Sequence, residues 1–289
     1  MMKRILKRVC LIPMALLILC SFGVCAAESG EPDYKVGLEI AFNHSEYVKG
    51  ETATATIKLT GLTDEKAAGA ALGAFETHIK FDNTKLEAEK FEFNDNLKLD
   101  SSDVSGFQVT DDNKDIIVAY FEKKSGVSLN SVIDDKLTIG TIQFKVLSGR
   151  TDNELKLNFE EDGYKTVVTK SFIDKKTVEE YAYSEFKGAE ARIVNAILEP
   201  GTAKLENNTV KTEGLRVAAS DNKGILIAQI YDKNTGLTKA TKVIPDLSKA
   251  SVSFDVSKID KSNLKVRYYL WDSFLGMKAL AESKAAEVK

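Results

Sequence analysis

Apolar and polar side chains alternate in short runs along most of this chain. In one run, the polar residues Glu76 and Lys80 alternate with apolar residues that include Ile79 and Phe81. A period of two is typical of a β-strand with one buried and one solvent-facing side. We therefore expect Ile79 and Phe81 to be buried, and Glu76 and Lys80 to be exposed. Strands of this kind are predicted at residues 36–42, 52–59, 75–81, 86–93, 116–121, 137–146, 155–159, 189–197, 209–218, 225–231, 238–244, 251–256 and 264–271.

Turn-forming residues separate the predicted strands. Short groups rich in glycine, asparagine and aspartate occur at Lys49-Gly50, Asp82-Asn83, Asp111-Asp112-Asn113, Ser148-Gly149 and Asp162-Gly163. Many short strands with turns at this spacing predict an all-β sandwich or barrel. Residues 177–186 fit either a short helix or a further strand.

The chain divides into two predicted domains. Glu199-Pro200-Gly201 separates one series of strands from a second series, so we expect one domain at residues 28–197 and another at residues 201–289. The second domain has about 90 residues, a length that fits a small immunoglobulin-like sandwich. It contains a predicted hairpin loop at residues 232–236.

The first residues have the pattern of an export signal. Basic residues within residues 1–8 precede an apolar run at residues 9–19, and the small residues Ala26 and Ala27 follow. This order predicts a signal peptide at residues 1–27 that is cleaved after Ala26 or Ala27. The apolar run is shorter than the about 20 residues of a membrane-spanning helix. We therefore expect a secreted, extracellular protein, either free or associated with the cell surface.

All three cysteines lie in this leader. Lipidation of Cys20 or Cys25 is an alternative to cleavage, but Leu19 and Val24 precede them, where a lipidated cysteine normally follows a small residue. Removal of the leader takes away its four basic residues and would change the formal charge from −3 to −7. The processed chain would then have no disulfide, no thiol nucleophile and no thiolate metal site. Its acidic balance argues against a nucleic-acid partner, and no second long apolar run predicts a membrane span.

Two blocks in the larger domain resemble the cohesin family. In residues 74–87, an acid-bearing strand ends in an aromatic–aspartate turn, and a Leu-Glu pair opens the next strand. The second block is an apolar strand at residues 117–121, a loop that ends in Ser125-Gly126, and residues 135–146, which close on Phe-Lys-Val. The resemblance spans residues 36–193.

This resemblance implies a nine-stranded jelly-roll sandwich of the bacterial carbohydrate-binding superfamily. Cohesins bind dockerins, the calcium-binding helical modules of secreted enzymes that degrade polysaccharides. A dockerin-like protein partner and a role in polysaccharide catabolism are therefore implied. The implied binding face contains Glu76, His78, Lys80, Tyr120, Lys123 and Lys124. Lys123 and Lys124 stand where cohesins often carry an acid, which favours a partner that is more acidic there.

Residues 266–280 are similar to the end of small accessory domains on extracellular proteins of clostridia and bacilli. This similarity indicates a Gram-positive context. The segment holds Trp271, the only tryptophan of the chain. Because Tyr268, Tyr269 and Trp271 alternate imperfectly, we expect Trp271 to pack in the core or against the sheet, whereas an exposed aromatic strip would favour sugar binding.

The sequence shows none of the residue patterns that are typical of an enzyme active site. A zinc site at His78 would need further ligands nearby, so a solvent-facing histidine is favoured. Residues 111–115 lack the spacing of an EF-hand calcium loop, which favours a hairpin tip. A nucleophile elbow, a phosphate loop and a dinucleotide fingerprint are absent from the sequence. We therefore expect no enzymatic activity, no cofactor and no metal.

The first hypothesis is a secreted, non-catalytic binding protein of cohesin type. The alternatives are a carbohydrate-binding protein on the same sandwich and a structural or adhesive component of the cell surface. Exposed aromatic side chains along one sheet would favour a sugar ligand, whereas a flat face of mixed polarity would favour a protein partner.

Overall fold

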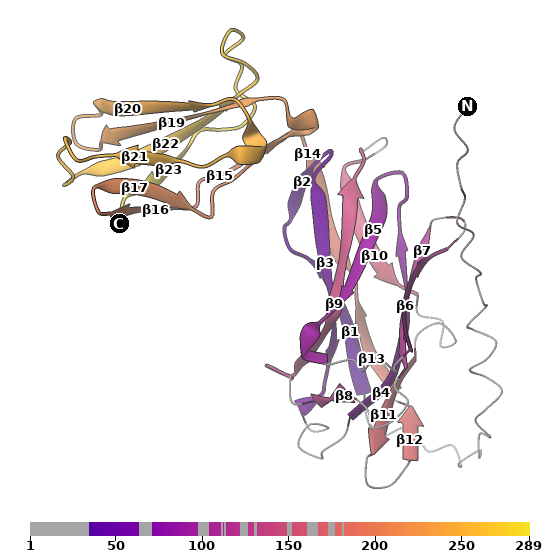
Figure 1. Cartoon of the computed structure of the whole chain (residues 1–289). Coiled ribbons are helices and arrows are strands. Elements are labelled where there is room, and N and C mark those ends of the chain that lie inside the picture. The colour runs from indigo at the N-terminus through magenta and orange to yellow at the C-terminus, as the bar shows by residue number, and fades with distance from the viewer. Residues whose placement is uncertain are drawn as a thin grey trace, which may run out of the picture. The chain divides into compact units, whose positions relative to one another are not determined.

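The computed structural model shows an almost entirely β protein (Figure 1). It describes residues 35–63, 71–97, 104–110, 112, 114–121, 127–129, 132–148, 152–160, 167–172, 177–180 and 182–289. The predicted signal peptide lies outside the described residues. No helix in the described part of the chain has the length and the apolar character that a membrane span requires.

Two sheets form the larger sandwich. The smaller sheet has five strands, in the spatial order β13 (Ala182–Lys187), β1 (Lys35–Phe42), β3 (Thr52–Thr60), β9 (Lys136–Val146) and β5 (Leu86–Phe93). The larger sheet has nine, with the order β12 (Thr177–Glu180), β11 (Val167–Phe172), β4 (Ala71–Phe81), β10 (Glu154–Phe159), β14 (Ala189–Val194) and β2 (Glu46–Val48). Beside this path, β7 (Asp115–Phe121) pairs with β4 and with β6 (Val104–Val109), and β8 (Val127–Ser128) pairs with β4.

The all-β prediction is confirmed. The predicted total of nine strands is not confirmed, because the two sheets hold 5 and 9 strands. Residues 177–186 fitted either a helix or a strand in the sequence. The structure has strands β12 and β13 there. Two strand pairs, β1–β13 and β14–β2, are parallel, and the other pairs of these sheets are antiparallel.

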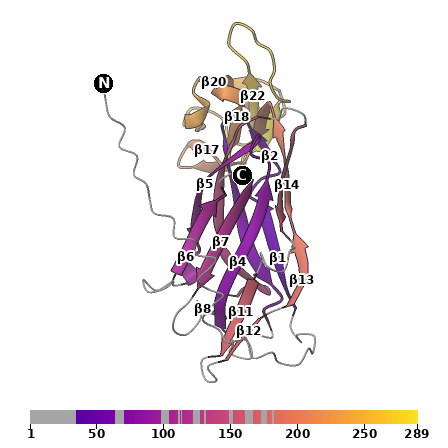
Figure 2. The ribbon, with the colours of Figure 1, turned by 90° about the vertical axis from the view of Figure 1, so that its right-hand side faces the viewer.

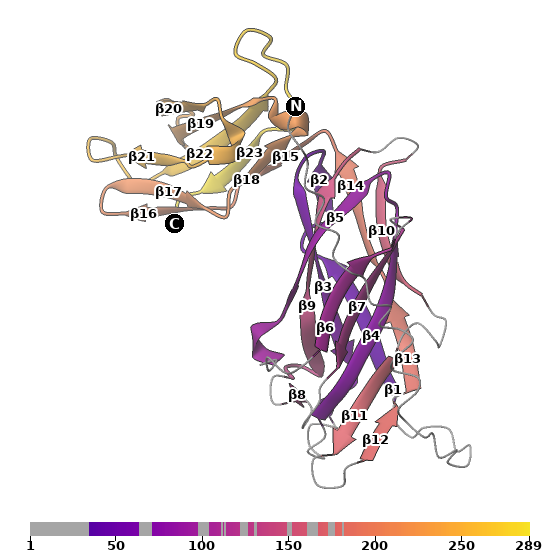
Figure 3. The same ribbon diagram turned by 45° about the vertical axis from the view of Figure 1, so that its right-hand side comes forward.

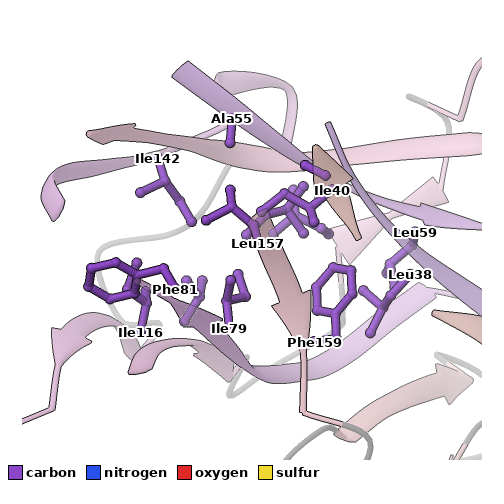
Figure 4. Close-up of a cluster of buried hydrophobic side chains, with 14 of the residues drawn as sticks. Leu38, Ile40, Ala55, Leu59, Ile79, Phe81, Ile116, Ile142, Leu157 and Phe159 are labelled. Carbon is purple, nitrogen blue, oxygen red and sulfur yellow. The ribbon is translucent and has the colours of Figure 1, made fainter. Parts of the chain in front are cut away.

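The core lies between the two sheets. Figure 4 shows Ile142 of β9 and Ala55 of β3 on one side, facing Ile79 and Phe81 of β4 on the other. The burial of β3 alternates strictly along its length, as the period-two pattern predicts. Interdigitated side chains of this kind fill the space between two packed sheets.

A short turn ends β4 and fixes its position. The Asp82 carboxylate accepts hydrogen bonds from the backbone N–H and the hydroxyl of Thr84, at 2.9 and 2.7 Å. The Asp82 carbonyl accepts from the backbone N–H of Lys85 and Leu86. These bonds satisfy the backbone where the chain reverses, and they confirm the predicted turn at Asp82-Asn83.

The C-terminal segment forms a second group of three small sheets. They contain two, three and four strands. The strands are β15 (Ala196–Glu199) with β18 (Arg216–Ala219); β16 (Thr202–Glu206), β17 (Thr209–Glu213) and β21 (Ser253–Asp255); and β20 (Thr238–Ile244), β19 (Ile225–Asp232), β22 (Leu264–Trp271) and β23 (Lys284–Glu287). The predicted hairpin loop is confirmed between β19 and β20, where the Asp232 carboxylate accepts from the backbone N–H of Asn234 and Thr235.

Two separate clusters of buried side chains correspond to these two groups of strands. The first cluster ends at Ile193 and the second begins at Leu198. The change of core therefore falls a few residues before the predicted boundary at Glu199-Pro200-Gly201. An immunoglobulin-like topology for the second group stays a prediction.

Trp271 does not lie in the second core. Along β22, the buried residues are Val266, Tyr268 and Leu270, and Trp271 is on the opposite face with intermediate exposure. Of the two expected roles of Trp271, packing in the core is wrong, because strict alternation along the strand points Tyr268 inward and Trp271 outward. Packing against the sheet agrees with its intermediate exposure and with its position beside Tyr269.

Candidate functional site

Strand β4 carries the candidate site on its outer face. Figure 2 and Figure 3 show β4 beside β7, which in turn lies beside β6. Phe75, Thr77, Ile79 and Phe81 point into the core and are at most 8% exposed. The alternate side chains, which include Glu76, His78 and Lys80, therefore face outward, as the sequence predicts.

Two acid–base pairs lie on this outer face. His78 Nε2 is 3.2 Å from Glu76 Oε1, and Lys80 Nζ is 3.1 Å from Glu160 Oε1. The backbone N–H of Glu160 also donates to the carbonyl of His78, at 2.9 Å. The side chains of His78 and Glu160 are only 15% and 14% exposed, whereas Lys80 is 55% exposed. The pairs are thus held against the sheet while the lysine remains accessible.

Strand β7 supplies apolar neighbours. Its register places Ala119 opposite Glu76, and Ile117 opposite His78. Both side chains are partly exposed on the outer face. We call the residues Glu76, His78, Lys80, Ile117, Ala119 and Glu160 the β4 face.

Next to the β4 face, the outer surface of the sheet carries little side-chain bulk. Gly106 of β6 pairs with Ala119, and a Cβ added at Gly106 would meet nothing within 4 Å. A small residue and a glycine side by side leave the backbone open to close approach by another molecule. The β4 face is therefore a rigid surface of mixed polarity, which suits contact with a protein better than chemistry on a small molecule.

Tyr120 does not belong to this surface. Its side chain is 3% exposed and packs in the core, and its partner across the ladder is the buried Phe75. The prediction that Tyr120 lies on the binding face is wrong. Its side chain points to the same side of β7 as the buried Ile116 and Val118. Lys123 and Lys124 lie outside the described residues.

Sequence reasoning missed Ile117 and Ala119. The apolar run of β7 hides the phase of the strand, because both of its faces carry apolar side chains. The signal that could have found them is the pairing of β7 with β4, whose phase is clear from its polar residues.

No metal site is evident in the part of the chain that the structure describes, where no three His, Cys, Asp or Glu side chains are grouped to hold an ion. The predicted hairpin tip between β6 and β7 is bridged by Thr110, whose hydroxyl donates to the Asp112 carboxylate at 2.7 Å. Asp111 and Asn113 lie outside the described residues.

In comparisons with known proteins, neither the protein-family models nor the curated proteins contain a match to this chain. Solved cohesin structures are similar to it. A type I cohesin from a cohesin–dockerin complex of Clostridium thermocellum matches with a TM-score of 0.42 and 13% identity, over 58% of this chain and 100% of the cohesin. A type I cohesin from Pseudobacteroides cellulosolvens gives 0.41 and 13%, over 56% of this chain and 93% of that one.

A non-cellulosomal cohesin from the archaeon Archaeoglobus fulgidus gives a TM-score of 0.36 and 16% identity, over 55% of this chain and 91% of that one. All three matches are below 20% identity and below a TM-score of 0.5. The β4 face is therefore interpreted from this chain's own residues.

Proposed function

We propose that this protein is a secreted, non-catalytic module that binds a protein partner through the β4 face. The observation that carries the proposal is the mixed character of this face, where the Glu76–His78 pair lies beside Ile117 and Ala119 on paired strands. A sheet is already rigid, so such a surface offers apolar area and charged anchors with little loss of conformational freedom on binding.

A dockerin-type module is the partner class that we propose. The cohesin from Clostridium thermocellum is itself part of a cohesin–dockerin complex, and the motifs at residues 74–87 and 135–146 resemble cohesins. The leader at residues 1–27 supports secretion, and dockerin-type partners would connect the protein with extracellular polysaccharide breakdown.

A sugar ligand on this sandwich is less well supported. The outward side chains described on β4, β7 and β10 include no Phe, Tyr or Trp. Sugar-binding surfaces use such rings as stacking platforms, so the β4 face favours a protein over a glycan.

The proposal is tested with the full-length protein immobilised on a biosensor. Recombinant dockerin modules are passed over it in the presence of calcium, and association and dissociation rates are recorded. Glu76→Gln keeps the shape of the side chain and removes its charge. If Glu76 is buried on binding, this change raises the dissociation rate about tenfold or more, because a buried partner is left unpaired.

The matched control is Glu87→Gln on β5, which is exposed on the opposite sheet. Its rates should equal those of the unchanged protein. Reversal of Lys123 and Lys124 to glutamate should slow association most at low salt, since long-range attraction is screened by ions. Binding of a dockerin that none of these changes alters would place the contact elsewhere and contradict the proposal.

A further inference from the structure

Strand β22 of the C-terminal segment presents a line of aromatic and cationic side chains to solvent. Its burial alternates at every position, and Arg267, Tyr269 and Trp271 all lie on the outward face. The core beneath them is filled by Val266, Tyr268 and Leu270, each 0% exposed. The outward residues are therefore not needed to fill the core.

The rings are close enough to act together. The ring centroids of Tyr269 and Trp271 are 6.0 Å apart. The guanidinium carbon of Arg267 lies 4.6 Å from the ring centroid of Tyr231 on the neighbouring β19, and one of its nitrogens donates to the Tyr231 hydroxyl at 3.4 Å. We call Tyr231, Arg267, Tyr269 and Trp271 the aromatic strip.

The aromatic strip is long and is bordered by hydrogen-bonding groups. Tyr231 pairs with Lys265, six positions along β22 from Trp271, so the strip extends for about 20 Å at the usual rise of a strand. Gln229 pairs with Arg267 between the rings, and Thr241 of β20 lies on the other side of Gln229. Figure 1 shows β20, β19 and β22 side by side.

The charge on this face is positive, although the whole chain carries −3. The outward side chains of β19 and β22 include Lys265 and Arg267 and no acid. Lys265 is paired with Glu287 of β23. Arg267 is exposed and forms no ion pair with any acid that the structure describes, so its charge is available to a ligand.

We propose that the aromatic strip binds a polysaccharide chain that carries carboxylates, as a polyuronate does. The negative faces of aromatic rings attract the C–H groups on the face of a pyranose ring. The planar guanidinium of Arg267 can hold a carboxylate with two parallel hydrogen bonds. The order of the strip, with one cation between aromatic rings, thus complements a chain of acidic sugars.

A single-stranded nucleic acid would also stack on aromatic rings. It carries a charge on every nucleotide, and proteins that bind it line its path with several cations. The aromatic strip has only one cation without an acid partner among the described residues, which favours the acidic glycan. This proposal does not depend on the β4 face.

The sole tryptophan makes the test direct. Oligogalacturonate is titrated into the full-length protein while the fluorescence of Trp271 is recorded, with a neutral cello-oligosaccharide of equal length in parallel. We expect a saturable change in emission with oligogalacturonate that weakens as salt is added, and an affinity at least tenfold lower for the neutral chain.

Arg267→Gln should lower the affinity for oligogalacturonate at least tenfold, whereas Lys211→Gln, which removes an exposed charge on β17 of a separate sheet, should leave it unchanged. Tyr269→Ala should abolish retardation of the protein in gels that contain polygalacturonate, and its unchanged thermal unfolding would show that the fold is intact. The absence of binding, equal binding by Arg267→Gln, or tighter binding of single-stranded DNA than of oligogalacturonate would each overturn the proposal.

Discussion

The ring centroids of Phe81 and Phe144 are 5.7 Å apart. Phe81 belongs to β4 and Phe144 to β9, so this contact joins the strand of the candidate site to the opposite sheet. The two side chains are 8% and 0% exposed. The β4 face is therefore supported from behind by a packed core.

Replacement of Phe81 by alanine should lower the free energy of unfolding by about 3–5 kcal/mol, because it removes buried area and leaves a cavity. Lys80→Ala is the control on the neighbouring position. The Lys80 side chain is 55% exposed, but its partner Glu160 is only 14% exposed, so the loss should be about 1 kcal/mol, well below that of Phe81→Ala. Urea unfolding of both variants measures these values, and equal losses would mean that the faces of β4 are assigned the wrong way round.

Asp135 should make stability depend on pH. Its carboxylate accepts hydrogen bonds from the backbone N–H of Gly61 at 2.9 Å and from the backbone N–H and hydroxyl of Thr63 at 2.7 and 2.6 Å. The Thr63 hydroxyl, first among these donors, lowers the pKa of Asp135. Because the folded pKa lies below the unfolded value of about 3.9, this contribution is present above pH 4 or so and is lost as pH falls through the folded pKa.

Asp135→Ala should therefore cost about 1 kcal/mol near neutral pH and progressively less towards pH 2. Thermal unfolding between pH 2 and 7 measures the difference. Asp134→Ala, next to it and also exposed, is the matched control and should show a smaller cost. A constant cost of Asp135→Ala across this range would exclude the ionised carboxylate as the cause.

Most of the sheet structure follows from period-two patterns. Strands β3, β5, β9 and β10 lie within one residue of their predicted bounds, because each alternates clearly and ends at a turn signal. Strand β16 was not predicted, since Ala203 is its only buried residue and such a short strand has no pattern to detect. Its pairing is set by the two-residue turn at Asn207 and Asn208, which both have positive φ, as a tight hairpin requires.

The candidate site was predicted in part. The outward orientation of Glu76, His78 and Lys80 was predictable because polar residues mark the outer face of β4, and their role in binding stays a prediction. Tyr120 was misplaced because a strand with apolar residues on both faces does not show its phase in the sequence. The sequence left Trp271 either in the core or against the sheet for a related reason: two adjacent tyrosines blur the alternation, and the burial of Val266 and Leu270 shows that Trp271 lies on the outer face.

Lys85 is one of two polar residues buried in the described core, at 6% exposure. Its ammonium contacts the carboxylate of Asp152, and it donates to the carbonyl of Glu154 at 2.9 Å. The Asp152 side chain is 54% exposed, so it can regain water when its partner is lost. Asp152→Ala should therefore destabilise the protein more than Lys85→Met, because only the first change leaves a buried charge with fewer partners. Urea unfolding of the two variants ranks them, and the reverse order would contradict this account.

The two core clusters predict two units that fold independently. Every buried residue of the first cluster lies between Val36 and Ile193, and every one of the second lies between Leu198 and Ala286. Fragments of residues 35–194 and 195–289 should each show a cooperative urea transition. Circular dichroism of the separate fragments makes the comparison with the full-length protein, and a disordered fragment would show that the division is wrong.

Ala119 gives the most selective test of the β4 face as a docking surface. It lies beside Gly106 and opposite Glu76, and a Cβ added at Gly106 would meet nothing within 4 Å. Ala119→Arg would fill this space with a long charged side chain that points away from the core, so stability should change by less than about 1 kcal/mol. A dockerin-type partner could no longer approach the sheet, and its affinity should fall at least about 30-fold, or ~2 kcal/mol.

Thr56→Arg is the control, because it places the same side chain on the outward face of the opposite sheet and should leave the affinity unchanged. Biosensor titrations of both variants decide the matter, because an equal affinity would show that the partner does not contact β7 and that the β4 face is not the docking surface.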